Sequence, residues 1–285
     1  MLRSLRLLAT IMTGAFAANA PISSSGVTLD VPPPFRTKMS IEHFQMGDEV
    51  LHIDWITNRA IAPMTRYKGF WGPETGDTAD DHPWTIDVYD MASPKVEAAY
   101  AHAKNGYEAG LDEWIEFLLP PSKSPPPFVA PVNKARAYLF ARYRQMHFRW
   151  GNAVSFLSQA TQDTGAYVAH NGHLTYEVWG FTKDRQHVVV GWFRVSHPEL
   201  PDWGEGVPQI AGIREDSPDL SYQIIDAENH HDSKRITKLY QEMARTAERA
   251  VEKDPKTKLI EKCRPNEFQP SLSAVDSFIN SLQMN

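Results

Sequence analysis

Two strand-like segments, the first with alternating residues and the second mostly apolar, are separated by a short polar turn and constrain the fold of this chain most strongly. Residues 173–181 read HLTYEVWGF, and residues 187–195 read HVVVGWFRV. The connection TKDRQ at 182–186 contains no apolar residue. A period of two is typical of β-strands, and a short polar connection favours antiparallel pairing of the two strands. The sequence therefore predicts an antiparallel sheet with at least one face buried against other elements.

The residues before this hairpin extend the predicted sheet. Residues 135–148 are apolar and aromatic with interleaved arginines and fit a helix or a strand, whereas 153–159 (AVSFLSQ) fit a strand. A Trp-Gly-Asn turn sequence at 150–152 separates them, and we interpret the pair as a second hairpin. The resulting meander covers about residues 136–195. Residues 84–89 (WTIDVY) alternate as well and predict a further strand.

Amphipathic patterns predict two helices within residues 94–118 and one each near 232–252 and 272–283. Pro94 after Ser93 suits the start of the first helix, and Ser271 suits the N-cap of the last. Each pattern has a single apolar face, which packing against a sheet would bury. We therefore expect an α+β fold in which an antiparallel β-sheet meander is packed by several α-helices.

The N-terminal residues 1–17 have the features of a signal peptide. Arg3 and Arg6 precede a short apolar run, and Ala15-Phe16-Ala17 fits the small-x-small cleavage pattern. The run is far shorter than the roughly 20 residues that span a bilayer. We expect an extracytoplasmic protein, periplasmic or secreted after cleavage, without a membrane span.

The remaining chain divides into a lead-in and one domain. Residues 18–39 are polar and contain three consecutive prolines, so we expect an extended Pro-rich lead-in. Residues 40–285 are predicted to form a single α+β domain. The Pro-rich stretch 120–131 (PPSKSPPPFVAP) fits a domain linker or a surface crossover, and we favour the crossover because the segment before it lacks a sufficient core.

Composition excludes several classes of protein. The chain has 285 residues, 42% of them hydrophobic, so it can bury a core and is not a disordered chain. A single Cys excludes an intrachain disulfide scaffold. The formal net charge of −6 argues against nucleic acid as a partner. The sequence also lacks the Gly-x-Ser-x-Gly, Gly-x-Gly-x-x-Gly, His-Glu-x-x-His and Cys-x-x-Cys motifs of common enzyme and metal sites.

Residues 127–201 carry a resemblance to a known group of proteins. They include PFVAPVNKARAY and FLSQ at 156–159, followed by a hairpin with Leu-x-Tyr at 174–176 and the ending HPELP. The C-terminal FQPSLSAVDSFINSL contributes to the match. These features resemble uncharacterised secreted or lipid-anchored bacterial proteins with a Phe-Leu-x-Gln strand, an Asn-rich loop and a Leu-x-Tyr hairpin. The sequence departs from that group at Gly180-Phe-Thr, at His170 and in lacking a lipid-attachment Cys. The resemblance implies export and a shared architecture, but no known activity.

His170 and His173 are the candidate metal ligands of the sequence. They flank Asn171-Gly172, and their spacing would place them on one face if the segment were helical. Gly172 and the strand that follows indicate a loop instead, and no third ligand is close in sequence. The structural alternative is a turn whose Asn and His side chains bond to the backbone, and we favour it.

Aromatic residues in predicted loops are the candidate ligand-binding residues. Trp71, Trp150 and Trp203 lie outside the predicted strands, so we expect them to be exposed, and Asn171 lies in the His loop. Aromatic side chains more often fill a core than line a binding groove. Cys263 stands between Lys262 and Arg264, and we expect a partly buried structural thiol.

Two functional hypotheses follow from these observations. The first is a non-catalytic extracytoplasmic binding or interaction module with an unknown ligand or protein partner, because an export signal and loop aromatics occur without catalytic motifs. The second is a secreted hydrolase or metal-dependent enzyme that uses the His170/His173 loop. The sequence identifies no cofactor.

Overall fold

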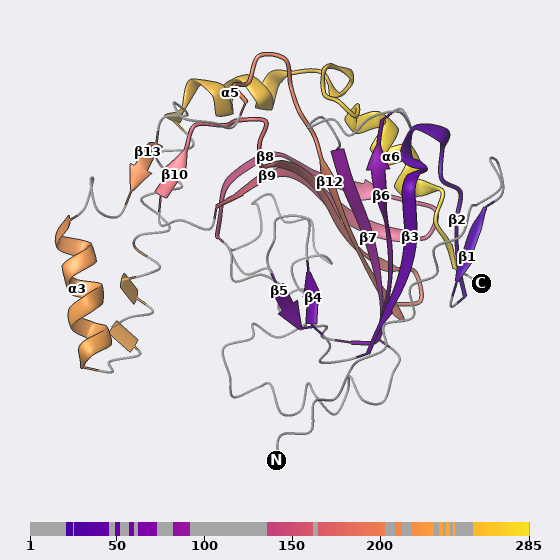
Figure 1. The fold of residues 1–285 in the computed structure, drawn as a ribbon, viewed down its shortest axis with the longest axis horizontal. Coiled ribbons are helices and arrows are strands. Elements are labelled where there is room, and N and C mark those ends of the chain that lie inside the picture. The colour runs from indigo at the N-terminus through magenta and orange to yellow at the C-terminus, as the bar shows by residue number, and fades with distance from the viewer. Residues whose placement is uncertain are drawn as a thin grey trace.

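The computed structural model of the chain describes the central sheet, three helices and several small strands (Figure 1). The described residues are 21–24, 26–45, 49–51, 57–59, 62–72, 82–91, 136–161, 165–202, 209–212, 218–230, 234–235, 238–239, 242 and 253–284.

A curved, seven-stranded antiparallel sheet forms the body of the molecule (Figure 1). In spatial order its strands are β3 (Thr37–Phe44), β6 (Met64–Trp71), β7 (His82–Asp90), β12 (His187–Arg194), β11 (Leu174–Thr182), β9 (Gly151–Thr161) and β8 (Arg136–His147). The last four strands are the predicted meander, which confirms the antiparallel sheet expected at 136–195. The hairpin β8–β9 also resolves the helix-or-strand alternative for 135–148 in favour of a strand.

Three earlier strands enlarge the sheet beyond the predicted meander. β7 pairs with β12 from Trp84 opposite Phe193 to Asp90 opposite His187, and β6 and β3 follow outward. The physical reason lies in β12 itself, where every residue from Val188 to Phe193 is buried. A strand that is apolar on both faces is stable in the interior of a sheet, so it needs a hydrogen-bonded neighbour on each side.

The small strands pair among themselves. β1 (Ile22–Ser24), β2 (Val27–Leu29) and β14 (Gln283–Met284) form a three-stranded sheet that joins the two ends of the described chain. β4 (Glu49–Leu51) pairs with β5 (Thr57–Arg59), and β10 (Gly165–Tyr167) pairs with β13 (Gln209–Gly212). Two 3-10 turns, η1 (Pro33–Phe35) and η2 (Pro265–Glu267), complete these elements.

The described chain is mostly β, which corrects the expected packing by several helices. Its three named helices are short: α3 (Pro218–Asn229), α5 (Pro255–Lys262) and α6 (Leu272–Asn280). The two helices predicted within 94–118 lie outside the described residues, as does most of 232–252. Within the described part, no helix is long and apolar enough to cross a bilayer.

Helix α6 confirms the predicted C-terminal helix and covers one face of the sheet. Ser271 caps it as expected, since its Oγ accepts a hydrogen bond from Ala274 N at 3.2 Å. Phe278 packs against Trp84 on the sheet, with ring centroids 5.0 Å apart. Phe35 packs against the Phe278 ring as well, with centroids 4.7 Å apart. The helix thereby joins the sheet and the N-terminal segment in one hydrophobic core.

The residues expected to be an extended lead-in belong to this core. Leu29, Val31 and Phe35 are at most 1% exposed. The proline run at 32–34 leads into η1, whose short turn directs Phe35 toward α6. The polar character of the surrounding residues therefore concealed three buried anchors.

The opposite face of the sheet has its own buried cluster. Along β12, Val188, Val190 and Trp192 alternate with the residues of the α6 core and belong to this second cluster. Arg66 and Asp87 lie within the sheet as a bidentate ion pair, with two N···O distances of 2.6 Å and at most 2% exposure. Pairing of this kind is what makes a buried charge tolerable.

Candidate functional site

The loop between β10 and β11 brings His170 and His173 close together, with ring centroids 5.5 Å apart. His170 is 1% exposed, and its Nδ1 accepts a hydrogen bond from Gly172 N at 3.1 Å. Its backbone N–H donates to Gln159 Oε1 at 2.9 Å. These contacts match the interpretation favoured from the sequence, which is a turn stabilised by hydrogen bonds between side chains and the backbone.

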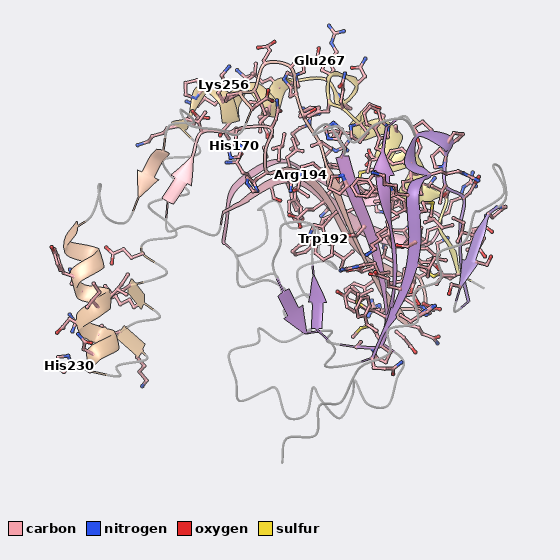
Figure 2. The ribbon with its side chains drawn as sticks, in the orientation of Figure 1. His170, Trp192, Arg194, His230, Lys256 and Glu267 are labelled. Carbon is pink, nitrogen blue, oxygen red and sulfur yellow. The ribbon has the colours of Figure 1, made fainter. Side chains whose placement is uncertain are left out.

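The surroundings of His170 are cationic. Arg194 donates a hydrogen bond to the Gly172 carbonyl, and it lies at the same end of the sheet as His170 (Figure 2). Burial, followed by His173 and Arg194, lowers the pKa of His170 to about 4. Neighbouring positive charge disfavours a metal cation for the same reason that it disfavours imidazolium. Among the described residues, the two histidines have no third His, Cys, Asp or Glu within metal-ligand range.

Asn171 connects this loop to a second one. Its Oδ1 accepts from His197 N at 2.8 Å, and its Nδ2 donates to the Leu200 carbonyl at 3.1 Å. Its backbone N–H donates to the Pro201 carbonyl at 2.8 Å. The predicted ligand-binding residue thus fixes the position of the loop that carries His197.

The candidate tryptophans occupy different environments. Trp150 is 5% exposed and stacks on Phe148, while its Nε1 donates to the Ile279 carbonyl of α6 at 2.9 Å. The exposure expected for Trp150 is therefore not found, because α6 covers the turn. Trp71 is half-buried and packs against the same core. Trp203 lies outside the described residues.

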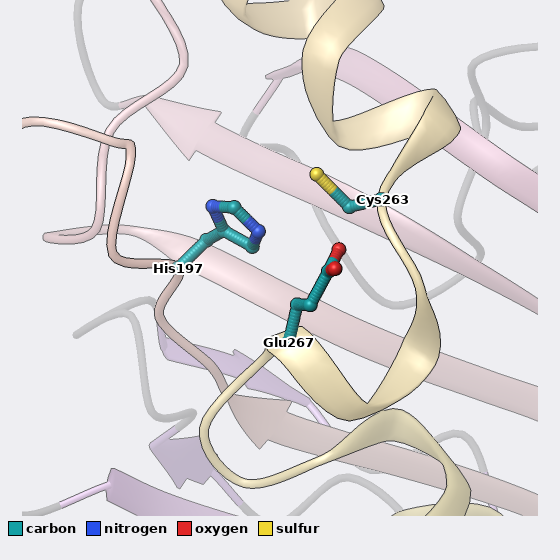
Figure 3. Close-up of side chains that lie close together, drawn as sticks. All are labelled: His197, Cys263 and Glu267. Carbon is teal, nitrogen blue, oxygen red and sulfur yellow. The ribbon is translucent and has the colours of Figure 1, made fainter.

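A different group of three side chains has the composition of a metal site. His197, Cys263 and Glu267 each direct one ligand atom into a common space, and these atoms all lie within 4.8 Å of one another (Figure 3). Within the part of the chain that the structure describes, this is the one group of three His, Cys, Asp or Glu residues with such convergence.

His197 supplies a buried nitrogen without a partner. The residue follows β12 and is 2% exposed, and its ring packs on Phe268 with centroids 5.0 Å apart. Its Nδ1 accepts from Glu199 N at 3.2 Å. Its Nε2 points toward Cys263 and Glu267 (Figure 3) and has no hydrogen-bond partner in the described structure. A buried polar atom left unpaired is costly and calls for an explanation such as an ion.

Cys263 is placed by the C-terminal end of α5. Asp254 is the N-cap of this helix, and its carboxylate accepts from Thr257 N at 2.8 Å, with Pro255 at the first helical position. The backbone becomes extended at Cys263 and stays extended at Arg264, the residue before Pro265. The Cys263 thiol donates to the Leu259 carbonyl at 3.2 Å.

Arg142 holds this helix end against the sheet. It lies in a bulge of β8 with a φ of 58°, which is uncommon for a residue with a side chain. Its guanidinium donates to the carbonyls of Ile260, Glu261 and Cys263, and these are the otherwise unpaired acceptors of a helix C-terminus. The bulge therefore fixes the position of the thiol.

Glu267 closes the group from the solvent side. It ends η2, and its side chain is 44% exposed. One carboxylate oxygen accepts from Arg264 N at 2.7 Å. Two backbone bonds between Ser196 and Gln269, at 2.8 and 3.0 Å, join the segments that carry His197 and Glu267. The ligand atoms are therefore held on a hydrogen-bonded frame.

The electrostatics of the three side chains favour metal binding over catalysis by a nucleophilic thiol. Burial raises the pKa of Cys263, and the carboxylates of Glu267 and Glu199 raise it further. A thiol activated for attack needs the opposite shift. Glu267 also lies on the Nε2 side of His197, together with the thiol, whereas a catalytic relay needs the acid at Nδ1. Burial lowers the pKa of His197, which keeps the imidazole neutral and able to ligate.

Few sequence features indicate this group of three side chains. Cys263 and Glu267 are four residues apart, but His197 is 66 positions before Cys263 and stands in a His-Pro pair that marks the end of a strand. No local ligand spacing exists for the three residues together. The available signals were the lone Cys and the acid four positions after it.

Comparison with known proteins adds no family to this description. Neither a scan of protein-family models nor searches of curated proteins and of solved structures found a match. The resemblance to exported bacterial proteins of unknown activity stays a prediction.

Proposed function

We propose that this chain is an exported, non-catalytic binding protein whose ligand is a divalent transition-metal ion, held by His197, Cys263 and Glu267. The observation that carries the proposal is the buried, unpartnered Nε2 of His197, directed at a thiol and a carboxylate within 4.8 Å. The predicted signal peptide supports the extracytoplasmic location.

The donor set indicates the class of metal. One nitrogen, one sulfur and one oxygen form a borderline set that suits Zn²⁺ and its neighbours, whereas Ca²⁺ and Mg²⁺ take oxygen ligands. Zinc prefers four ligands at about 2.0–2.3 Å, so the three groups must close in slightly around the ion. Three protein ligands leave one coordination position, which water or an external ligand would fill.

Zinc titration of the reduced, metal-stripped protein tests the proposal. We expect one zinc per chain in the wild type, measured by competition with a chromophoric chelator, and loss of that binding in Cys263→Ser. His170→Gln is the matched control, because His170 is equally buried and also bonds to a backbone N–H. The proposal fails if the wild type binds no zinc or if Cys263→Ser binds it equally well.

A further inference from the structure

The hydrogen bond at His197 Nδ1 has a consequence for the proposed metal site. Glu199 N donates to Nδ1 at 3.2 Å, so Nδ1 uses its lone pair and the neutral ring carries its proton on Nε2. A metal needs the lone pair of Nε2. Metal binding therefore requires the other tautomer, in which Nδ1 carries the proton.

In that tautomer two donors would face each other. The Nδ1–H of His197 and the backbone N–H of Glu199 cannot form a hydrogen bond, so the 3.2 Å contact between these nitrogens must open. A ligating histidine almost always donates its second N–H to a carboxylate, a carbonyl or water. The question is which group next to His197 becomes that acceptor.

One candidate acceptor is the Pro198 carbonyl. Residues 197–200 form a turn, closed by a bond from Leu200 N to the His197 carbonyl at 3.0 Å. Rotation of the peptide between Pro198 and Glu199 would replace the N–H by that carbonyl. Such a rotation demands a positive φ at the third turn position, which favours Gly. Glu199 occupies that position and does not have a positive φ.

The Glu199 carboxylate is the other candidate, and it has the right surroundings. The backbone of Glu199 is anchored to α5, because Lys256 Nζ donates to its carbonyl at 2.7 Å. Its side chain is exposed and can change rotamer without disturbing the core. Its backbone N–H lies 3.2 Å from His197 Nδ1, so its side chain starts close to that nitrogen and is long enough to bring the carboxylate to it.

We propose that Glu199 is the positioning residue of the metal site, and that its carboxylate accepts the Nδ1–H of His197 once a metal occupies Nε2. This inference rests on the proposed metal binding at His197, Cys263 and Glu267. The step balances: the imidazole proton moves from Nε2 to Nδ1 through solvent, the Cys263 thiol releases its proton to solvent, and the metal forms one bond to each ligand. Glu199 acts through His197 and does not touch the ion.

Affinity measurements on Glu199 variants test the inference with zinc itself as the probe. Glu199→Ala removes the acceptor, and we expect zinc binding to weaken about 10- to 100-fold, the range typical of such partners. Glu199→Gln keeps an oxygen acceptor but loses the charge, so its affinity should lie between those of the alanine variant and the wild type. Asp30→Asn, at an exposed acid, is the control for net charge and should bind like the wild type.

A tautomer measurement on His197 tests the metal at Nε2, on which the role of Glu199 rests. In ¹⁵N-imidazole NMR spectra, His197 should carry its proton on Nε2 without zinc and on Nδ1 with zinc. Unchanged affinity in Glu199→Ala, with one zinc still bound through Cys263, would overturn the role of Glu199 and leave the metal site standing. Equal losses in Glu199→Ala and Glu199→Gln would also overturn it, because they would indicate charge alone. A wild type that binds no zinc would remove both proposals.

Discussion

His170 and His197 have the same local structure and opposite surroundings. Each is at most 2% exposed, and each accepts a backbone N–H from two residues further along at Nδ1, at 3.1 and 3.2 Å. Around His170 the nearby charged groups are His173 and Arg194. Around His197 the charged groups are Glu199, Glu267 and Lys256, and the converging ligand atoms are those of Cys263 and Glu267.

The difference shows that the partners brought by distant elements decide what a buried histidine can do. Both side chains fill a turn and bond to its backbone, which is a structural role. Only His197 faces groups that become anionic ligands, and these come from α5 and η2. The predicted pair His170/His173 has the closer sequence spacing but the less suitable charge for a cation.

The largest expected effect is the difference in zinc affinity between variants of His197 and of His170. His197→Gln should weaken zinc binding about 1000-fold, because a direct ligand contributes more than the 10- to 100-fold of its supporting partners. His170→Gln should leave the affinity unchanged. Isothermal titration calorimetry of both variants makes the comparison, and equal losses in the two would show that the charge argument is wrong.

Acid should destabilise the protein through His170. Its pKa is lowered from 6.5 to about 4, so the unfolded chain binds a proton more readily than the folded one. The corresponding stability is fully present above pH 6.5 and is lost as the pH falls toward 4, by about 3 kcal/mol. Urea unfolding at a series of pH values measures it. In His170→Gln this part of the pH dependence should disappear, and an unaltered profile would assign it to other groups.

Zinc should stabilise the fold through His197 and not through His170. At a free zinc concentration 100 times the Kd, a ligand that binds only the folded state adds about 2.7 kcal/mol. The rise in Tm should occur in the wild type and in His170→Gln, and it should be absent in Cys263→Ser. A zinc-dependent rise that persists in Cys263→Ser would place the metal at another site.

Asn171 joins the loops that carry His170 and His197, so its replacement should destabilise both loops. The expected effect is smaller than those of the preceding predictions. Asn171→Ala leaves the His197 backbone N–H without its acceptor, and we expect a loss of about 1–3 kcal/mol of unfolding free energy. Asn171→Asp keeps the Oδ acceptor for His197 but places a carboxylate oxygen where the amide donates to the Leu200 carbonyl and to Asp202 Oδ1, so it should cost at least as much. Chemical denaturation orders the two variants, and a smaller loss in Asn171→Asp would assign the main contribution to the acceptor.

The sequence predicted the parts of the fold that depend on local periodicity. Alternation at residues 174–178 indicated β11, the apolar run at 187–195 after a polar turn indicated β12, and Ser271 marked the start of α6. The pairing of Trp84 with Phe193 was not predictable in this way, because more than 100 residues separate the two strands. Leu29 and Phe35 were hidden in a polar, Pro-rich segment whose composition indicated an extended lead-in.

The candidate site was less predictable for the same reason. His170 and His173 are recognisable as candidate ligands because they are close in sequence, and Cys263 is distinctive because it is the single Cys. The convergence of His197 with Cys263 depends on three tertiary features: the bridge from Ser196 to Gln269, the Arg142 bulge and the Asn171 link. None of them has a sequence period.

The most direct test of the metal site is X-ray absorption at the zinc edge on the zinc-loaded wild-type protein. Coordination by His197, Cys263 and Glu267 predicts one sulfur neighbour at about 2.3 Å and nitrogen or oxygen neighbours at about 2.0–2.2 Å, with the outer-shell scattering of one imidazole. A zinc shell without sulfur, or with two imidazoles as at a His170/His173 site, would contradict the account.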